Sequence, residues 1–177
     1  MTRSYGRPKQ RKKITLMRTK LVRNIMAPLV VAFALLPMVA APAIRPSMEG
    51  GKLQGTWEMQ ITLTDCSGHV IRSFPSLIEF VAGGTVVESN AGTPQALKTP
   101  GEGAWRHTTD NNYAFSFKFF TFNPQSVFTG WTIITGETTV DETGNANAGS
   151  ATVEVHAPNG VLVAAACAAI SGTRFEL

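Results

Sequence analysis

The sequence predicts a single all-β domain of about eight antiparallel strands, arranged as a sandwich or a barrel, behind a cleaved N-terminal signal peptide. Short segments in which apolar and polar residues alternate fill positions 53–175, and clusters of Gly, Pro, Asn and Asp separate them. Such segments at spacings of about 8–12 residues are typical of all-β domains. No segment of this region keeps the 3.6-residue apolar period that an amphipathic helix requires.

The N-terminal segment has the layout of a secretory signal. Nine of the sixteen basic residues and no acidic residue lie in positions 1–24, and the uncharged stretch 25–44 follows. A basic region, an apolar region and a small-x-small site are the three parts of a signal peptide. Ala41-Pro42-Ala43 fits that site, so we expect residues 1–43 to be removed, with Met17 as a second candidate start. We therefore expect the protein to be secreted or periplasmic.

A transmembrane anchor is the alternative interpretation of stretch 25–44, because about 20 apolar residues can cross a bilayer. Pro28, Pro37 and Pro42 favour the signal peptide, since proline interrupts a continuous helix. We thus expect no stable membrane anchor after processing. Residues 44–52 then form a polar lead-in that we expect to be flexible, and residues 53–177 form the folded domain.

The charge balance argues against a nucleic-acid partner. The chain has 16 Lys and Arg residues against 12 Asp and Glu, a net charge of +4. Because nine basic residues precede residue 25, the remainder carries seven basic and twelve acidic residues, a net charge of −5. A body of this charge lacks the basic surface that a phosphate backbone attracts.

Period-two alternation locates the strands. The first strand buries one face through Trp57, Met59 and Ile61 and exposes Glu58 and Gln60. The expected strands are 53–64, 70–81, 85–89, 103–108, 113–122, 126–140, 151–156 and 161–175. Pro75 marks an edge or a bulge in the second strand, and the phase change at Phe119-Phe120 predicts a bulge. The stretch 90–101 is expected to be a long loop that acts as a lid or a docking segment.

Gly55-Thr56-Trp57 on the first strand and Arg174 near the end of the last resemble the calycin superfamily, which includes the lipocalins. This resemblance implies an eight-stranded antiparallel up-and-down barrel whose first strand starts with Gly-x-Trp. It also implies that an Arg from the final strand packs across that Trp and closes the base of the barrel. Trp57 and Arg174 are therefore expected to be structural residues.

Two residue pairs indicate nearly the same register between the first and last strands. Facing residues of an antiparallel pair have a constant sum of residue numbers. The sum is 231 for Trp57 with Arg174 and 233 for Cys66 with Cys167. In an exported chain, two cysteines favour a disulfide over two free thiols. We expect this disulfide on the outer face, because each Cys is out of phase with the Trp or Arg of its strand.

Motifs for catalysis are scarce, so the aromatic residues are the best functional candidates. The three histidines lack metal-ligand spacing, and the sequence holds no Gly-x-Ser-x-Gly motif. We therefore expect no catalytic residue, metal or cofactor. The alternation of Tyr113–Phe119 points its aromatic side inward and Lys118 outward. The candidate ligand-binding residues are Phe80, Trp105, Tyr113, Phe115, Phe117 and Trp131, with His107 and Arg106 as further polar groups.

Three functions compete at this point. The calycin resemblance implies a secreted carrier or scavenger of a small apolar ligand, and this is the function that we expect. A cofactor-free enzyme that encloses an apolar substrate is the first alternative. A secreted protease inhibitor or interaction module, with a partner that the sequence does not identify, is the second. An interior cavity of about 300 Å³ or more would favour ligand or substrate binding over a filled core.

Overall fold

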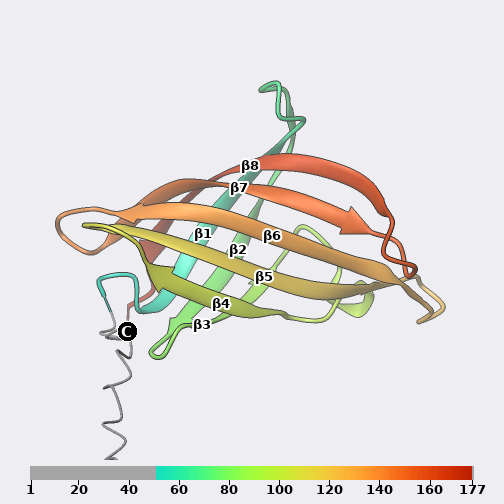
Figure 1. The fold of residues 1–177 in the computed structure, drawn as a ribbon, viewed down its shortest axis with the longest axis horizontal. Helices are drawn as coiled ribbons and strands as arrows, with labels where there is room; N and C mark the ends of the chain where they lie inside the picture. The colour runs from blue at the N-terminus through green and yellow to red at the C-terminus, as the bar shows by residue number, and fades with distance from the viewer. Residues whose placement is uncertain (1–50, 177) are drawn as a thin grey trace, which may run out of the picture. The chain divides into compact units, whose positions relative to one another are not determined.

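The computed structural model describes residues 51–176, which form a closed barrel of eight antiparallel strands (Figure 1). Each strand pairs with the next along the chain, and the last pairs with the first. The predicted all-β up-and-down barrel is therefore confirmed. The strands are β1 (Gly55–Thr64), β2 (Val70–Val81), β3 (Thr85–Asn90), β4 (Gly101–His107), β5 (Asn112–Phe122), β6 (Phe128–Val140), β7 (Ala146–His156) and β8 (Leu162–Arg174), with a short 3₁₀ helix, η1 (Gln95–Leu97), before β4.

The expected signal peptide, 1–43, the second candidate start at Met17 and positions 44–50 of the lead-in lie outside the described residues. The last two lead-in residues, Gly51 and Lys52, are described and lie against the barrel. The backbone oxygen of Lys52 accepts a hydrogen bond from the Arg174 guanidinium. Within the described part of the chain, no helix is long and apolar enough to cross a membrane.

One register closes the barrel between β1 and β8. Trp57 faces Arg174, and the pairing continues without a shift to Thr64 and Cys167. The Arg174 Cζ atom lies 4.4 Å from the centre of the Trp57 ring. The Arg174 guanidinium also donates to the backbone oxygens of Gln54, at 2.8 Å, and Gly144, at 2.9 Å. Arg174 thus ties the segment before β1 and the β6–β7 connection to one end of the barrel.

The predicted disulfide joins the same two strands. Cys66 and Cys167 are bonded, with their Cα atoms 4.9 Å apart. Cys66 lies just beyond β1 with a φ of 65°, whereas Cys167 pairs with Thr64 within the ladder. The two cysteines are therefore diagonal rather than directly opposite, which explains why their residue numbers sum to two more than the register. Ala166 and Ala168, the neighbours of Cys167 on β8, face the interior, so the disulfide lies outside.

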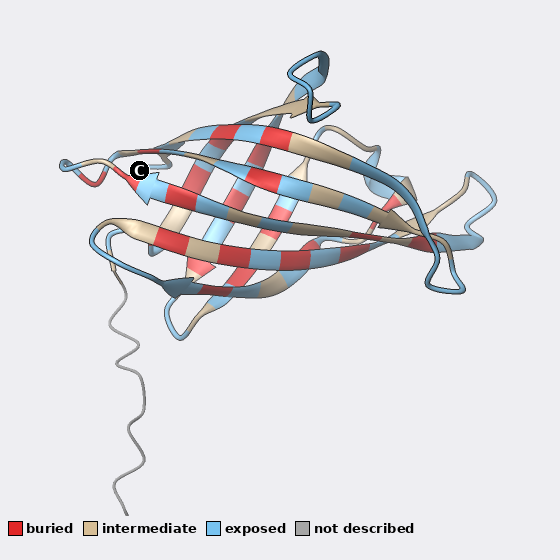
Figure 2. Cartoon of the chain, turned by 45° about the horizontal axis from the view of Figure 1, so that its top comes forward, coloured by how far each residue is buried: buried red, intermediate tan, exposed pale blue. Residues whose placement is uncertain are grey.

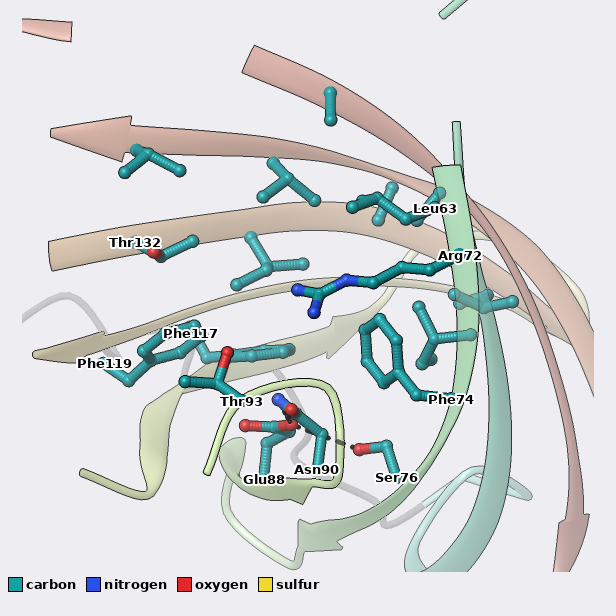
Figure 3. A pocket seen from close by; sticks show the side chains of 18 of the residues that line it. Leu63, Arg72, Phe74, Ser76, Glu88, Asn90, Thr93, Phe117, Phe119 and Thr132 are labelled. Carbon is teal, nitrogen blue, oxygen red and sulfur yellow. Dashed lines mark hydrogen bonds between the residues drawn. The ribbon is translucent and has the colours of Figure 1, made fainter. Parts of the chain in front are cut away.

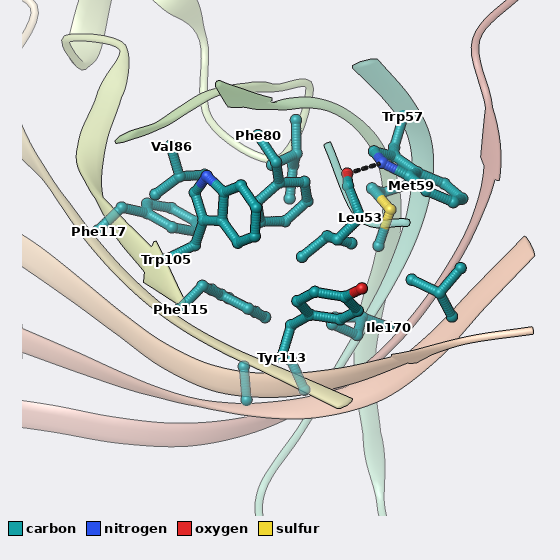
Figure 4. Packing of buried hydrophobic residues seen from close by; sticks show 14 of the residues in the cluster. Leu53, Trp57, Met59, Phe80, Val86, Trp105, Tyr113, Phe115, Phe117 and Ile170 are labelled. Atoms are coloured by element: carbon teal, nitrogen blue, oxygen red, sulfur yellow. Dashed lines mark hydrogen bonds between the residues drawn. The ribbon is translucent and has the colours of Figure 1, made fainter. Parts of the chain in front are cut away.

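A packed core fills one end of the barrel, which we call the closed end (Figure 4). Buried and exposed residues alternate along the strands, as Figure 2 shows. The indole N–H of Trp57 donates to the backbone oxygen of Leu53 at 2.8 Å, and that of Trp105 donates to Val81 at 2.9 Å. Both tryptophans can therefore be buried without an unpaired donor. The largest fully buried side chains are Leu53, Trp57, Phe80, Val86, Tyr113 and Val140.

Two local predictions were wrong. The β5–β6 pairing continues through Phe119 and Phe120, and its shift falls at Phe122 instead. Phe119 faces the interior and Phe120 the outside, where its ring lies 5.9 Å from that of Phe128. β7 begins at Ala146 rather than 151, because closure gives its small and polar first residues ladder partners on both β6 and β8.

Pro75 interrupts neither β2 nor its pairing with β1. It faces Gln60 with no shift of register, so no bulge forms there. The β2–β3 ladder begins only at Ser76 and Asn90. Pro75 therefore lies just beyond the end of the β3 ladder, where its missing N–H removes no strand hydrogen bond.

Candidate functional site

The opposite end of the barrel encloses a cavity of about 400 Å³ (Figure 3). We call this end of the barrel the open end. The open end carries the β1–β2, β3–β4, β5–β6 and β7–β8 connections. Ile71 and Arg72 line the cavity and are themselves exposed to solvent, so the cavity has its mouth there. Its volume lies within the range of about 300–1,000 Å³ that is typical of small-molecule pockets.

Small and aliphatic side chains form one wall of the cavity, the apolar wall. β8 contributes Ala164, Ala166, Ala168 and Ile170, and β1, β6 and β7 contribute further aliphatic residues. An alanine fills much less space than the residues typical of a packed core. The alanines of β8 therefore leave room that larger side chains would occupy, which is one physical reason why this half of the barrel is hollow.

The aromatic side of β5 forms the floor. Phe115, Phe117 and Phe119 are buried and line the cavity. The rings of Phe115 and Phe117 are stacked, with centres 6.1 Å apart. Lys118 points out of the barrel, and its Nζ atom lies 4.2 Å from the centre of the Trp131 ring. The aromatic side of this strand therefore faces inward, as its alternation predicts.

A buried ion pair lies in the wall opposite the apolar wall, which we call the polar wall. Glu88 on β3 accepts a hydrogen bond from Lys98 Nζ at 2.9 Å, and the two side chains are 3% and 0% exposed. The other Glu88 oxygen accepts from Ser76 Oγ at 3.2 Å and from the Asn90 side-chain amide. Lys98 Nζ also lies 4.5 Å from the centre of the Phe119 ring. Donors from three residues thus satisfy the Glu88 carboxylate, which fits a binding surface better than a free general base.

Arg72 reaches from β2 over the mouth of the cavity (Figure 3). Its Nη1 atom donates to the backbone oxygen of Gly92 in the β3–β4 connection. Its Cζ atom lies 5.2 Å from the centre of the Phe74 ring. The connection itself is held by hydrogen bonds from Gly92 N to Asn90 Oδ1 and from Thr99 N to Phe120 O, at 2.9 and 3.0 Å. This segment therefore forms a fixed part of the polar wall, to which it adds Thr93.

The predicted ligand-binding residues divide between the two ends of the barrel. Phe115 and Phe117 line the cavity. Phe80, Trp105 and Tyr113 instead belong to the packed core of the closed end. Phe80 contacts the edge of the cavity floor, since its ring centre lies 6.1 Å from that of Phe115.

Three other candidates do not reach the cavity. Trp131 was expected inside but lies on the outer face, stacked on His156 with ring centres 5.6 Å apart. Its neighbour Thr132 takes the inward position instead. Arg106 is exposed on the outer face, because it alternates with the inward Trp105. His107 is exposed at the rim of the closed end, where its Nε2 atom lies 2.5 Å from the Asp110 backbone oxygen.

The sequence reasoning missed the polar residues of the cavity. Arg72 and Ser76 share the phase of the buried Ile78 on β2, and Glu88 shares that of Val86 on β3. Following this alternation through polar positions would have placed these side chains inside. Lys98 offered no such signal, because it follows η1 in a connection without a periodic pattern.

A second, more open depression lies outside the barrel, between β1, β2 and the β3–β4 connection. It cannot enclose a ligand as the interior cavity does. Across residues 51–176, no group of three or more His, Cys, Asp and Glu side chains is placed to hold a metal ion. The interior cavity, with one apolar and one polar wall, is therefore the candidate functional site.

Of the comparisons with known proteins, one found a similar solved structure. No protein-family model matches the chain, and no curated protein matches its sequence. The chain is similar to the crystal structure of Rv2717c from M. tuberculosis, with 10% sequence identity, 71% of this chain and 94% of that chain covered, and a TM-score of 0.41.

Proposed function

We propose that this is an exported, non-enzymatic protein of the calycin type that binds a small apolar ligand inside its barrel. The observation that carries the proposal is the cavity of about 400 Å³ at the open end of an otherwise packed barrel. An eight-stranded barrel is wide enough to be filled by its own side chains or to hold one small ligand. Here the closed end is filled, and the open end has room for the ligand.

The lining determines the class of ligand. Phenyl rings from β5 and aliphatic side chains from β1, β6, β7 and β8 make up most of the cavity surface. Removing apolar ligand surface from water against such a lining is favourable by roughly 25 cal/mol per Å² before the costs of association. The Glu88 network and Arg72 supply the few polar groups that orient a ligand.

Export is the second part of the proposal. The N-terminal pattern of a basic region, an apolar region and Ala41-Pro42-Ala43 supports a cleaved signal. The Cys66–Cys167 disulfide supports it independently, because disulfides persist in oxidising compartments such as the periplasm and the extracellular space. The Trp57–Arg174 contact supports the assignment to the calycin type, since that arrangement is what the resemblance implies.

Binding of a neutral apolar dye, N-phenyl-1-naphthylamine, tests the proposal. We expect the protein to enhance the fluorescence of the dye with saturation at one site. Ala166→Phe should abolish the enhancement, because Ala166 lines the cavity and a phenyl group would occupy it. Ala169→Phe is the matched control, because Ala169 is exposed on the same strand, between Thr62 and Ser150.

Thermal melts should show that both variants are folded. No saturable dye binding by the wild-type protein would contradict the proposal. Equal loss of binding in the two folded variants would place the dye outside the cavity and would contradict it as well.

A further inference from the structure

We propose that the ligand is an amphipathic anion, whose hydrocarbon body lies against the apolar wall and whose acidic head group is bound by Arg72 at the mouth. This inference rests on the proposed function and adds the chemical class of the ligand. It follows from the charge balance of the cavity and from the way in which Arg72 is held.

The charges at the cavity leave one cation without a partner. Glu88 and Lys98 neutralise each other as an ion pair with a separation of 2.9 Å. Arg72 takes part in none of the ion pairs found within residues 51–176. Counted over residues 51–176, the lining of the cavity therefore carries one net positive charge, located at its mouth.

Arg72 is positioned rather than free in solvent. The backbone oxygen of Gly92 binds Nη1, and the Phe74 ring lies against the guanidinium. Gly92 is itself packed on that ring: a Cβ at this position would meet three Phe74 ring atoms at 2.8 Å. This close approach fixes the carbonyl that holds Arg72. Among the described residues, none accepts a hydrogen bond from Nε or Nη2 of Arg72.

The remaining guanidinium donors suit an anionic oxygen. An arginine edge can give two parallel N–H bonds to a carboxylate, and such charge-assisted bonds are stronger than bonds between neutral groups. The site also limits the cost of desolvation, because Arg72 is exposed and the head group stays in contact with water. The aliphatic and phenyl residues below Arg72 receive the apolar body.

Displacement of N-phenyl-1-naphthylamine by decanoate and by decan-1-ol, which share one hydrocarbon chain, tests the inference. We expect decanoate to displace the dye at a concentration about tenfold or more below that of decanol. A hydrogen bond to a charged group changes a binding constant by about this factor or more. Arg72→Gln should remove the preference or reverse it, while decanol and the dye still bind. Arg106→Gln is the matched control, because Arg106 is exposed on the outer face, and it should keep the preference.

Further measurements separate this inference from the proposed function. Arg72→Lys should keep part of the preference, and added salt should reduce it in the wild type. Decyl sulfate that binds as tightly as decanoate would identify a general anion site rather than a carboxylate site. Equal displacement by decanoate and decanol, or a preference that survives Arg72→Gln, would overturn the inference and leave the proposed function standing. Absence of dye binding in the wild type would contradict the proposed function instead.

Discussion

Lys98 neutralises Glu88, a carboxylate buried in the cavity wall, although Lys98 belongs to a connection rather than a strand. Removing one partner of a buried ion pair leaves an uncompensated charge, which usually costs about 3–5 kcal/mol. We therefore expect Lys98→Met to lower the free energy of unfolding by about that amount, as measured by denaturant unfolding.

The double variant Glu88→Gln/Lys98→Met should recover much of this loss, because no charge then remains buried. Lys118→Met is the control, since Lys118 contacts aromatic rings on the outer face and is exposed. It should cost less than about 1 kcal/mol. A loss in Lys98→Met no larger than that in the control would show that the pair contributes nothing to stability.

Residue by residue, the sequence predicted side-chain direction only where apolar and polar residues alternate clearly. Tyr113–Phe119 alternates in this way, and its aromatic residues do face inward. β6 offers Trp131, Thr132 and Ile133 in a row, and hydrophobicity cannot decide which of them is inside. Thr132 is buried within the barrel, while Lys118 and His156 cover Trp131 from outside.

At the scale of the element, the β1–β2 turn is organised by one carboxylate. Asp65 Oδ1 accepts hydrogen bonds from the Ser67 hydroxyl, at 2.8 Å, and from the backbone N–H groups of Ser67 and His69, at 2.9 and 3.1 Å. The bonds from the Ser67 and His69 side chains are the main causes that lower the Asp65 pKa from 3.8 to about 2.

A lowered pKa means that the folded turn favours the ionised carboxylate. The stabilisation is thus complete well above pH 3.8 and is lost as the pH falls through about 2. We expect the Ser67 and His69 amide resonances to shift together in an NMR titration with a midpoint of about 2. Asp65→Asn should abolish that transition. A midpoint near 3.8 in the wild type would mean that the turn does not hold the carboxylate.

All eight strands were predicted from alternation and turn residues, but their ends and irregularities were not. A strand such as Ala146–His156 begins with residues of low β propensity, and the two neighbouring strands stabilise it. The connection that supplies Lys98 and Gly92 has no periodic pattern, so its contribution to the polar wall depends on tertiary contacts. The candidate site was therefore predicted only in its β5 floor.

At the scale of the whole molecule, the Cys66–Cys167 disulfide joins the first and last strands across 101 positions of sequence. In the chain-entropy model a loop of this length contributes about 4–5 kcal/mol, and engineered cases often give less. We expect the Cys66→Ser/Cys167→Ser variant to lose about 2–5 kcal/mol of unfolding free energy in urea. Reduction of the wild type should have the same effect and should not change the double variant. An unchanged urea midpoint in both cases would show that the pairing of β1 with β8 is stable without the disulfide.

The packed and hollow halves of the barrel share the same strands. Tightly packed side chains at the closed end resist displacement, whereas the walls of a cavity have few neighbours to restrain them. In addition, β8 has no β1 partner from Leu162 to Ala166, beyond the last pair at Thr64 and Cys167. β8 thus pairs on both sides from Cys167 to Thr173, but from Leu162 to Ala166 it pairs with β7 alone. For the proposed apolar ligand, we expect this unpaired edge of β8 to be the part of the mouth that moves most when the ligand enters or leaves.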